Sequence, residues 1–187
     1  MEIDRIIDSI YALPVTSRTK LTEAIVEVTY PKDHRLLSAD KVERDIYFVK
    51  KGIVRAYTNS SGGEVTFWFG KEGDTVVSMR SYVANQPGYE NIELLEDCML
   101  YKLNMTALNR LFTEDIHISN WGRKFAEQEL LKTEERLIAR QFRTASERYA
   151  ELMKNHPELL QRIQLSYIAS YLGITQVSLS RIRAKIK

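Results

Sequence analysis

The sequence predicts an α+β protein with an N-terminal β-roll or jelly-roll, a long central helix and a C-terminal helix-turn-helix. Three observations predict this order: short alternating apolar segments fill residues 22–104, apolar residues recur at helical spacing over 116–142, and two short helical patterns meet at a glycine within 165–183. A chain of 187 residues has room for one well-packed domain and a smaller second one. We therefore expect three parts, over residues 1–115, 116–143 and 144–187.

Five segments of the N-terminal part are rich in β-branched and aromatic residues, which favour strands. They are residues 25–30, 45–49, 53–58, 64–69 and 91–95. Gly, Pro and Asn residues between these segments predict turns. Short strands at this spacing, with glycine-containing turns, are typical of a β-roll or jelly-roll.

Residues 116–142 predict one continuous helix, because this segment contains no Gly or Pro after Gly122. Its apolar residues recur at helical spacing, and they are Trp121, Phe125, Leu130, Leu131, Leu137 and Ile138. So long a helix needs a partner for its apolar stripe. That partner is either the roll itself or the same helix of a second subunit, which would form a symmetric dimer. The candidate dimer-interface residues are Leu130, Leu131, Leu137 and Ile138.

The segment after this helix is separately capped and basic. Thr144 and Glu147 fit a capping box, which starts a new helix that ends near Asn155. Residues 140–187 carry 9 Lys or Arg against 3 Asp or Glu, a net of +6, whereas the preceding 139 residues carry 18 against 22, a net of −4. A basic block of this kind is typical of a phosphate-binding surface, although basic tails are also often simply solvated.

The first of the two C-terminal helices has the features needed to pack against a second. Ile168 and Leu172 lie four residues apart on one face, and Ala169 is small enough for a second helix to cross closely. Gly173 follows, and glycine readily adopts the left-handed conformation that reverses the chain. We therefore expect a sharp turn at this glycine.

The second helix predicts a surface that contacts DNA. Thr175 is a suitable N-cap, and Leu179, Ile182 and Ile186 form a narrow apolar stripe. The opposite face and its flanks are small, polar or basic. The candidate DNA-binding residues are Thr175, Gln176, Val177, Ser178, Ser180, Arg181, Arg183 and Lys185.

The residue types on this face suggest separate roles. Gln176 can pair with adenine, Arg181 with guanine, and Val177 can touch a thymine methyl group. Four further residues are suited to phosphate contacts, namely Thr175, Ser178, Arg183 and Lys185. The alternative is an ordinary helical hairpin with a solvated face.

From about residue 20 to 187 the chain resembles the Crp/Fnr family of bacterial transcription regulators, most closely over 168–175 and 179–183. The resemblance implies a cyclic-nucleotide-binding-like sensor roll, a dimerisation helix and a DNA-binding helix-turn-helix, and therefore a cytoplasmic regulator that is not an enzyme. Its implied partners are double-stranded DNA with an inverted repeat, a second copy of the chain and RNA polymerase. Gln176, Val177 and Arg181 fall where family members read bases, and Val177 replaces an acidic residue common there.

The same resemblance locates an altered effector site. Cyclic-nucleotide-binding members hold the ribose with a Glu and the cyclic phosphate with an Arg-Ser pair, whereas this chain has Ser78 in the first place and Glu90-Asn91 in the second. A carboxylate repels a phosphate and removes a charge-assisted contact. We expect either an unidentified small effector other than cyclic AMP or no ligand. The candidate effector-site residues are Val77, Ser78, Met79, Glu90 and Asn91.

Other chemistry finds little support in the sequence. The isolated histidines and the single Cys98 do not predict a metal site, a cofactor or an internal disulfide. No Gly-rich phosphate loop or Ser nucleophile elbow is present, and the first ten residues lack the apolar run of a signal peptide. The alternative function is a cupin-like metal enzyme or ligand-binding roll, which would require clustered His, Asp or Glu inside the roll.

Overall fold

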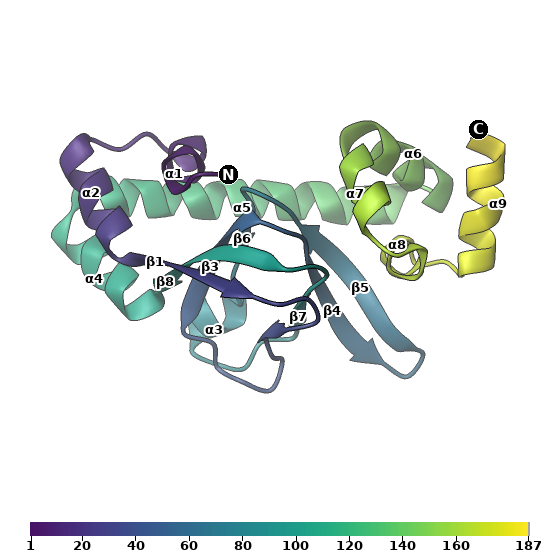
Figure 1. Cartoon of the computed structure of the whole chain (residues 1–187), viewed down its shortest axis with the longest axis horizontal. Helices are drawn as coiled ribbons and strands as arrows, with labels where there is room; N and C mark the ends of the chain where they lie inside the picture. The colour runs from purple at the N-terminus through teal and green to yellow at the C-terminus, as the bar shows by residue number, and fades with distance from the viewer. Residues whose placement is uncertain (187) are drawn as a thin grey trace. The chain divides into compact units, whose positions relative to one another are not determined.

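The computed structural model describes residues 1–186, except the side chain of Ile186, and confirms the predicted α+β class. It contains two compact units. The first comprises Met1–Arg55 and Phe69–Leu130, and the second comprises Ala56–Trp68 and the chain from Leu131 onward. The hairpin segment 56–68 therefore belongs with the C-terminal helices, a grouping that the sequence did not suggest. The helix over 116–142 continues from the first unit into the second (Figure 1).

Two four-stranded sheets form the β-roll (Figure 1). One has the order β1-β8-β3-β6, built from Ile25–Tyr30, Cys98–Asn104, Asp45–Lys51 and Thr75–Val76. The other has the order β2-β7-β4-β5, built from Arg35–Leu37, Asn91–Leu94, Val54–Ser60 and Gly63–Gly70. All five predicted strands are present, while β2, β6 and β8 come in addition.

Strand β8 (Cys98–Asn104) occupies the centre of its sheet, pairing antiparallel with β1 on one side and β3 on the other. Leu100 faces Val28 in one ladder and Val49 in the other. Cys98 and Leu100 lie on one face of β8 and Leu103 lies on the other, and all three are fully buried. This strand therefore anchors the roll.

Two N-terminal helices cover the roll, and neither was predicted. In α1 (Ile3–Ile10), Ile6 and Ile7 are completely buried, and the Ile7 carbonyl accepts a hydrogen bond from Trp121 Nε1 at 3.1 Å. The second helix, α2, spans Val15–Glu23. The core shared by these helices, the roll and the start of the long helix includes Leu21, Phe48, Leu108 and Ile118.

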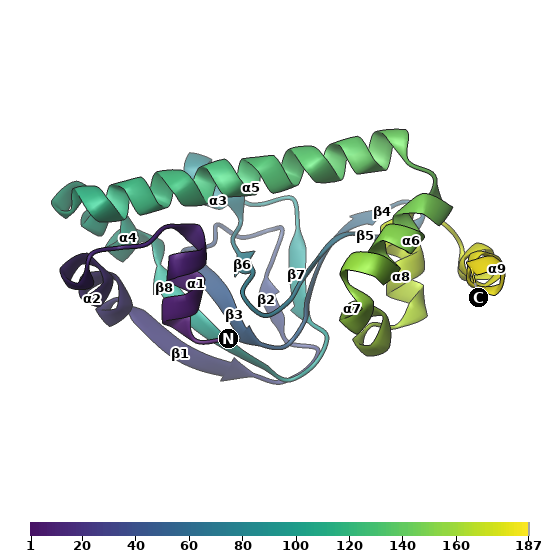
Figure 2. The same ribbon diagram turned by 90° about the horizontal axis from the view of Figure 1, so that it is seen from above.

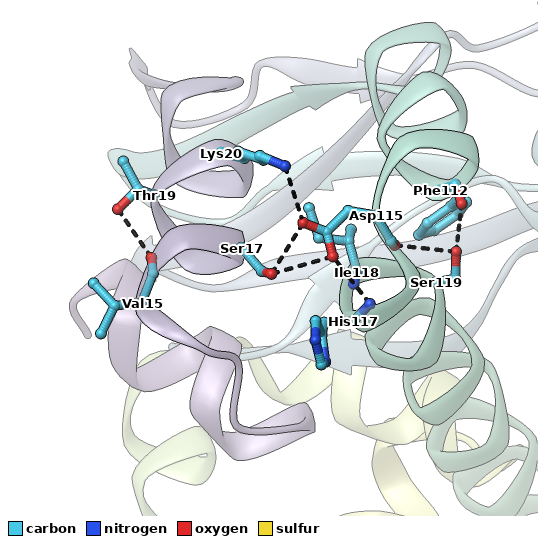
Figure 3. A network of polar contacts seen from close by, with 9 residues as sticks. All are labelled: Val15, Ser17, Thr19, Lys20, Phe112, Asp115, His117, Ile118 and Ser119. Atoms are coloured by element: carbon cyan, nitrogen blue, oxygen red, sulfur yellow. Dashed lines mark hydrogen bonds and ion pairs between the residues drawn. The ribbon is translucent and has the colours of Figure 1, made fainter.

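The long helix α5 spans Ile116–Phe142, as the sequence predicted, and follows α4 (Met105–Glu114). Asp115 fixes its start (Figure 3): its side chain accepts hydrogen bonds from the backbone N–H groups of His117 and Ile118, at 3.0 and 3.4 Å. The same carboxylate accepts from the Ser17 hydroxyl and pairs with Lys20 at 3.3 Å. One carboxylate thus caps α5 and ties it to α2.

Acid should remove the stability that the Asp115 carboxylate contributes to this junction, and a variant without the carboxylate should lack this pH dependence. Burial alone would raise the pKa of Asp115, but the hydrogen bonds from Ser17, His117 and Lys20 outweigh it and lower the pKa below its usual value. Its stabilising contribution is present above the ordinary carboxyl pKa of about 4 and is lost as pH falls through the lowered folded value. Thermal unfolding should therefore show that Asp115→Asn lowers the Tm near neutral pH, with the difference shrinking below pH about 4. A constant Tm difference across this range would contradict the assignment.

The single cysteine is a buried core residue. Its Sγ donates to the carbonyls of Glu96 and Ile53 at 3.3 and 3.7 Å, and burial, followed by the nearby Glu96 charge, raises the pKa of the Cys98 thiol to about 11. Gly52 is required beside it, because a Cβ there would lie 2.3 Å from the sulfur.

We expect negligible alkylation of Cys98 by iodoacetamide at pH about 8, since thiolate is the reactive form. Mass spectrometry should find the thiol unmodified in folded protein and fully modified in denaturant. Modification of the folded protein at the rate of a free cysteine would show that Cys98 is accessible.

The second unit contains four short helices, α6 to α9 (Figure 2). The predicted capping box begins α6 (Ala145–Asn155): Thr144 Oγ1 accepts from the Glu147 N–H at 3.2 Å, while Glu147 accepts from the Thr144 N–H at 2.8 Å. Helix α7 (Pro157–Arg162) was not predicted, although proline at a first helical position is favourable. The last two helices are α8 (Leu165–Leu172) and α9 (Gln176–Ile186).

Candidate nucleic-acid interface and effector site

A left-handed glycine joins α8 to α9, as the sequence predicted. Gly173 has φ +67°, and its N–H and that of Ile174 donate to the Ser170 and Ala169 carbonyls, both at 3.0 Å. Ile168 and Leu172 are buried. The turn therefore ends α8, and the apolar face of this helix is buried.

Arg148 of α6 reinforces this turn, and sequence reasoning missed it. Its Nη2 donates to the Leu172 carbonyl at 2.7 Å, which satisfies an otherwise open group at the C-terminal end of α8. The pattern gave no signal for this contact, because the two residues lie 24 positions apart on different helices.

Thr175 caps α9 as predicted. Its Oγ1 accepts from the Ser178 N–H at 3.2 Å and donates to the Ser178 hydroxyl at 3.1 Å. Leu179 is buried and Ile182 is half-buried, in agreement with the predicted stripe, while the Ile186 side chain lies outside the described residues. The Ser178 hydroxyl, predicted to contact phosphate, is thus engaged inside the cap.

The remaining predicted contact residues of α9 form an exposed surface. Gln176, Val177, Ser180 and Arg181 project from the same side of the helix, and Val177 is 61% exposed despite being apolar. Arg183 and Lys185 flank them and are also exposed. Because α9 contains no acidic residue, its surface is electrostatically suited to a polyanion.

Two of the candidate effector-site residues, Ser78 and Glu90, lie close together. A Cβ at Gly88 would lie 2.5 Å from Ser78 Oγ and 2.8 Å from Glu90 Oε1, so both oxygens converge on this glycine. Both atoms are buried and have no hydrogen-bond partner among the described residues, while Glu90 Oε2 accepts from the Tyr89 N–H at 2.9 Å. The site therefore offers a carboxylate and a hydroxyl instead of a guanidinium.

The other three candidate effector-site residues do not converge on this point. Asn91 Oδ1 accepts from the Ala39 N–H at 3.2 Å, which gives it a structural role. Val77 packs against the hydrophobic core, and Met79 is exposed. Arg80 is paired with Gln86 and lies over the Tyr89 ring, so its guanidinium is engaged on the loop before Glu90.

The apolar residues of α5 form two groups, one buried and one exposed to solvent. Ile118, Trp121 and Phe125 are buried within the first unit. The four predicted interface residues are exposed, and they are Leu130, Leu131, Leu137 and Ile138. At 100° per residue the second group lies roughly opposite the first. These four side chains are therefore left uncovered in the single chain.

Two features of residues 1–186 bear on other functions. Within residues 1–186, no three His, Cys, Asp or Glu side chains are grouped so that they could hold a metal ion. No helix in that range combines the length and hydropathy needed to cross a membrane.

The chain matches one protein-family description and several solved structures. Residues 27–115 match the cyclic nucleotide-binding domain family, whereas no curated protein matches the chain. FixK2 from Bradyrhizobium japonicum is 22% identical, with a TM-score of 0.72 over 87% of this chain and 84% of that one. The catabolite activator protein of Thermus thermophilus is 18% identical, with a TM-score of 0.59 over 94% of this chain and 84% of that one.

A third similar structure is described as a member of the crp/fnr family. A protein from Eubacterium rectale assigned to the crp/fnr family of transcriptional regulators is 14% identical, with a TM-score of 0.72 over 92% of this chain and 83% of that one. At such identities the likeness concerns the fold, and it confirms the resemblance found in the sequence. Residues 27–115 therefore match the cyclic nucleotide-binding domain family, and the chain shares its fold with FixK2 and with a regulator of the crp/fnr family.

Proposed function

We propose that this protein is a cytoplasmic, dimeric transcription regulator that reads an inverted repeat in DNA with α9 and acts on transcription by RNA polymerase. The observation that carries the proposal is the helix pair joined at Gly173, whose second helix exposes Gln176, Val177 and Arg181 and has no acidic residue. A helix of this kind fits the major groove, and glutamine and arginine can each pair with a base edge through two hydrogen bonds.

A second copy of the chain is the proposed partner of the exposed face of α5. Leu130 and Leu137 are 71% and 62% exposed, and they are spaced seven residues apart. Pairing two such helices around a two-fold axis would cover these side chains. It would also supply two recognition helices for the two halves of an inverted repeat.

Selection from random-sequence DNA tests the proposal. The purified protein should enrich an inverted repeat with half-site centres about one helical turn, roughly 34 Å, apart. Its affinity for the enriched sequence should fall steeply with salt, because lysines and arginines displace counterions from the phosphates. Recovery of no common sequence after repeated selection would contradict the function.

The proposed effector is not cyclic AMP. Glu90 places a carboxylate where the resemblance expects a phosphate-binding arginine, and Ser78 Oγ and Glu90 Oε1 both lack a partner within the described residues. Loss of one charge-assisted pair costs about 1.5–3 kcal/mol, or roughly ten- to 150-fold in affinity, and the carboxylate adds repulsion. The unmet hydrogen-bonding capacity of these two buried oxygens favours an effector with donor groups.

We therefore expect calorimetry to detect no micromolar binding of cyclic AMP or cyclic GMP. A cyclic-AMP-binding protein, measured in the same buffer, provides the positive control. Micromolar binding of either nucleotide would overturn the roles assigned to Ser78 and Glu90.

A further inference from the structure

The outer edge of β5 is hydrogen-bonded by a side chain of the DNA-binding helix pair. Ser170, on α8, accepts a hydrogen bond from the Thr66 N–H at 2.9 Å and donates one to the Glu64 carbonyl at 3.1 Å. All three residues belong to the second compact unit. One hydroxyl therefore joins two segments about a hundred residues apart in the sequence.

The two backbone groups that Ser170 contacts are those that a further strand would use. Glu64 and Thr66 are two residues apart, so their backbone groups point to the same side of β5. Because β5 is the last strand of its sheet, this side has no neighbouring strand. Thr66 is only 1% exposed, so loss of the contact would remove a hydrogen bond from a buried N–H, whereas Glu64 is exposed.

We infer that the β4–β5 hairpin is a positioning arm for the helix-turn-helix, and that Ser170 holds α8 on the outer edge of β5. This inference rests on the proposed DNA-binding function. The hydroxyl holds α8 in one orientation on the hairpin, so less orientational freedom is lost when α9 binds DNA.

A matched pair of variants tests the contact itself. Ser170→Thr keeps the hydroxyl. Ser170→Val has nearly the same shape as Ser170→Thr but no hydroxyl, so any difference between these two variants reports the hydrogen bonds. Amide exchange followed by NMR should show faster exchange of the Thr66 N–H in Ser170→Val than in Ser170→Thr or the unmodified protein. Equal exchange in all three would overturn the contact, whether or not the protein binds DNA.

The same pair tests the positioning role. On the selected operator, Ser170→Val should bind about fivefold more weakly than Ser170→Thr, the order of one neutral hydrogen bond. The slope of log affinity against log salt should be the same for both, because a lost phosphate contact would lower it by about one. Unchanged or higher affinity of Ser170→Val, or a lower slope, would overturn the inference. Failure of the unmodified protein to bind any DNA would instead refute the proposed function.

Discussion

Leu137→Glu is expected to convert the dimer into folded monomers and to weaken operator binding by roughly a hundredfold or more, the scale of linking two binding events. Leu137 is an exposed leucine on the face of α5 that lies opposite the buried Ile118 and Trp121. A glutamate at this place would bury two like charges across the two-fold axis without partners, which is strongly unfavourable. Light scattering coupled to size-exclusion chromatography measures the mass, and circular dichroism verifies the fold.

A matched control separates the position from the charge. Lys132→Gln changes the net charge by the same amount on the side of α5 away from Leu137, so it should leave the dimer and operator affinity unchanged. If Leu137→Glu remains a folded dimer, the interface does not lie on this face.

Arg181→Ala should weaken operator binding by about 1–3 kcal/mol and abolish the preference at one base pair. Arg181 is exposed on α9 beside Gln176 and Val177, and its fork of donors can pair with two acceptors of guanine. Competition against all single-base variants of the operator would locate the affected position. Because binding to random DNA depends on phosphate contacts, it should change much less.

Lys185→Ala provides the comparison. Lys185 flanks the base-reading face, so its loss should weaken binding to operator and random DNA similarly and lower the salt slope by about one. If Arg181→Ala also weakens both DNAs equally, Arg181 contacts phosphate and does not read a base.

Regular patterns allowed much of the fold to be predicted from the sequence. The 3.6-residue period of the long helix predicted its bounds, because its periodic stretch is long and uninterrupted. Local chemistry predicted the Thr144 capping box and the left-handed Gly173, since both depend on residues within one turn of each other. Apart from the half-buried Ser178, the predicted site residues of α9 are exposed, because a short helix with one apolar stripe presents its other face to solvent.

Features that depend on distant contacts could not be predicted. Strands β2 and β6 are too short to show a period, and α1 is stabilised by burying Ile6 and Ile7 beside Trp121, more than a hundred residues away. Arg148 and Ser170 bind backbone groups of remote segments, which leave no spacing signal. Residues that support the two proposed DNA-binding helices are therefore harder to predict from the sequence than residues on the surface of these helices.

Fluorescence anisotropy with the selected operator tests the central claim most directly, in a comparison with the same half-sites separated by five additional base pairs. Five base pairs turn one half-site by about half a helical turn, to the other side of the duplex. A dimer that reads both halves with its two α9 helices should bind the spaced DNA at least about a hundredfold more weakly, because only one half-site can then be engaged at a time. Equal affinity for the two DNAs would contradict two-fold recognition of an inverted repeat.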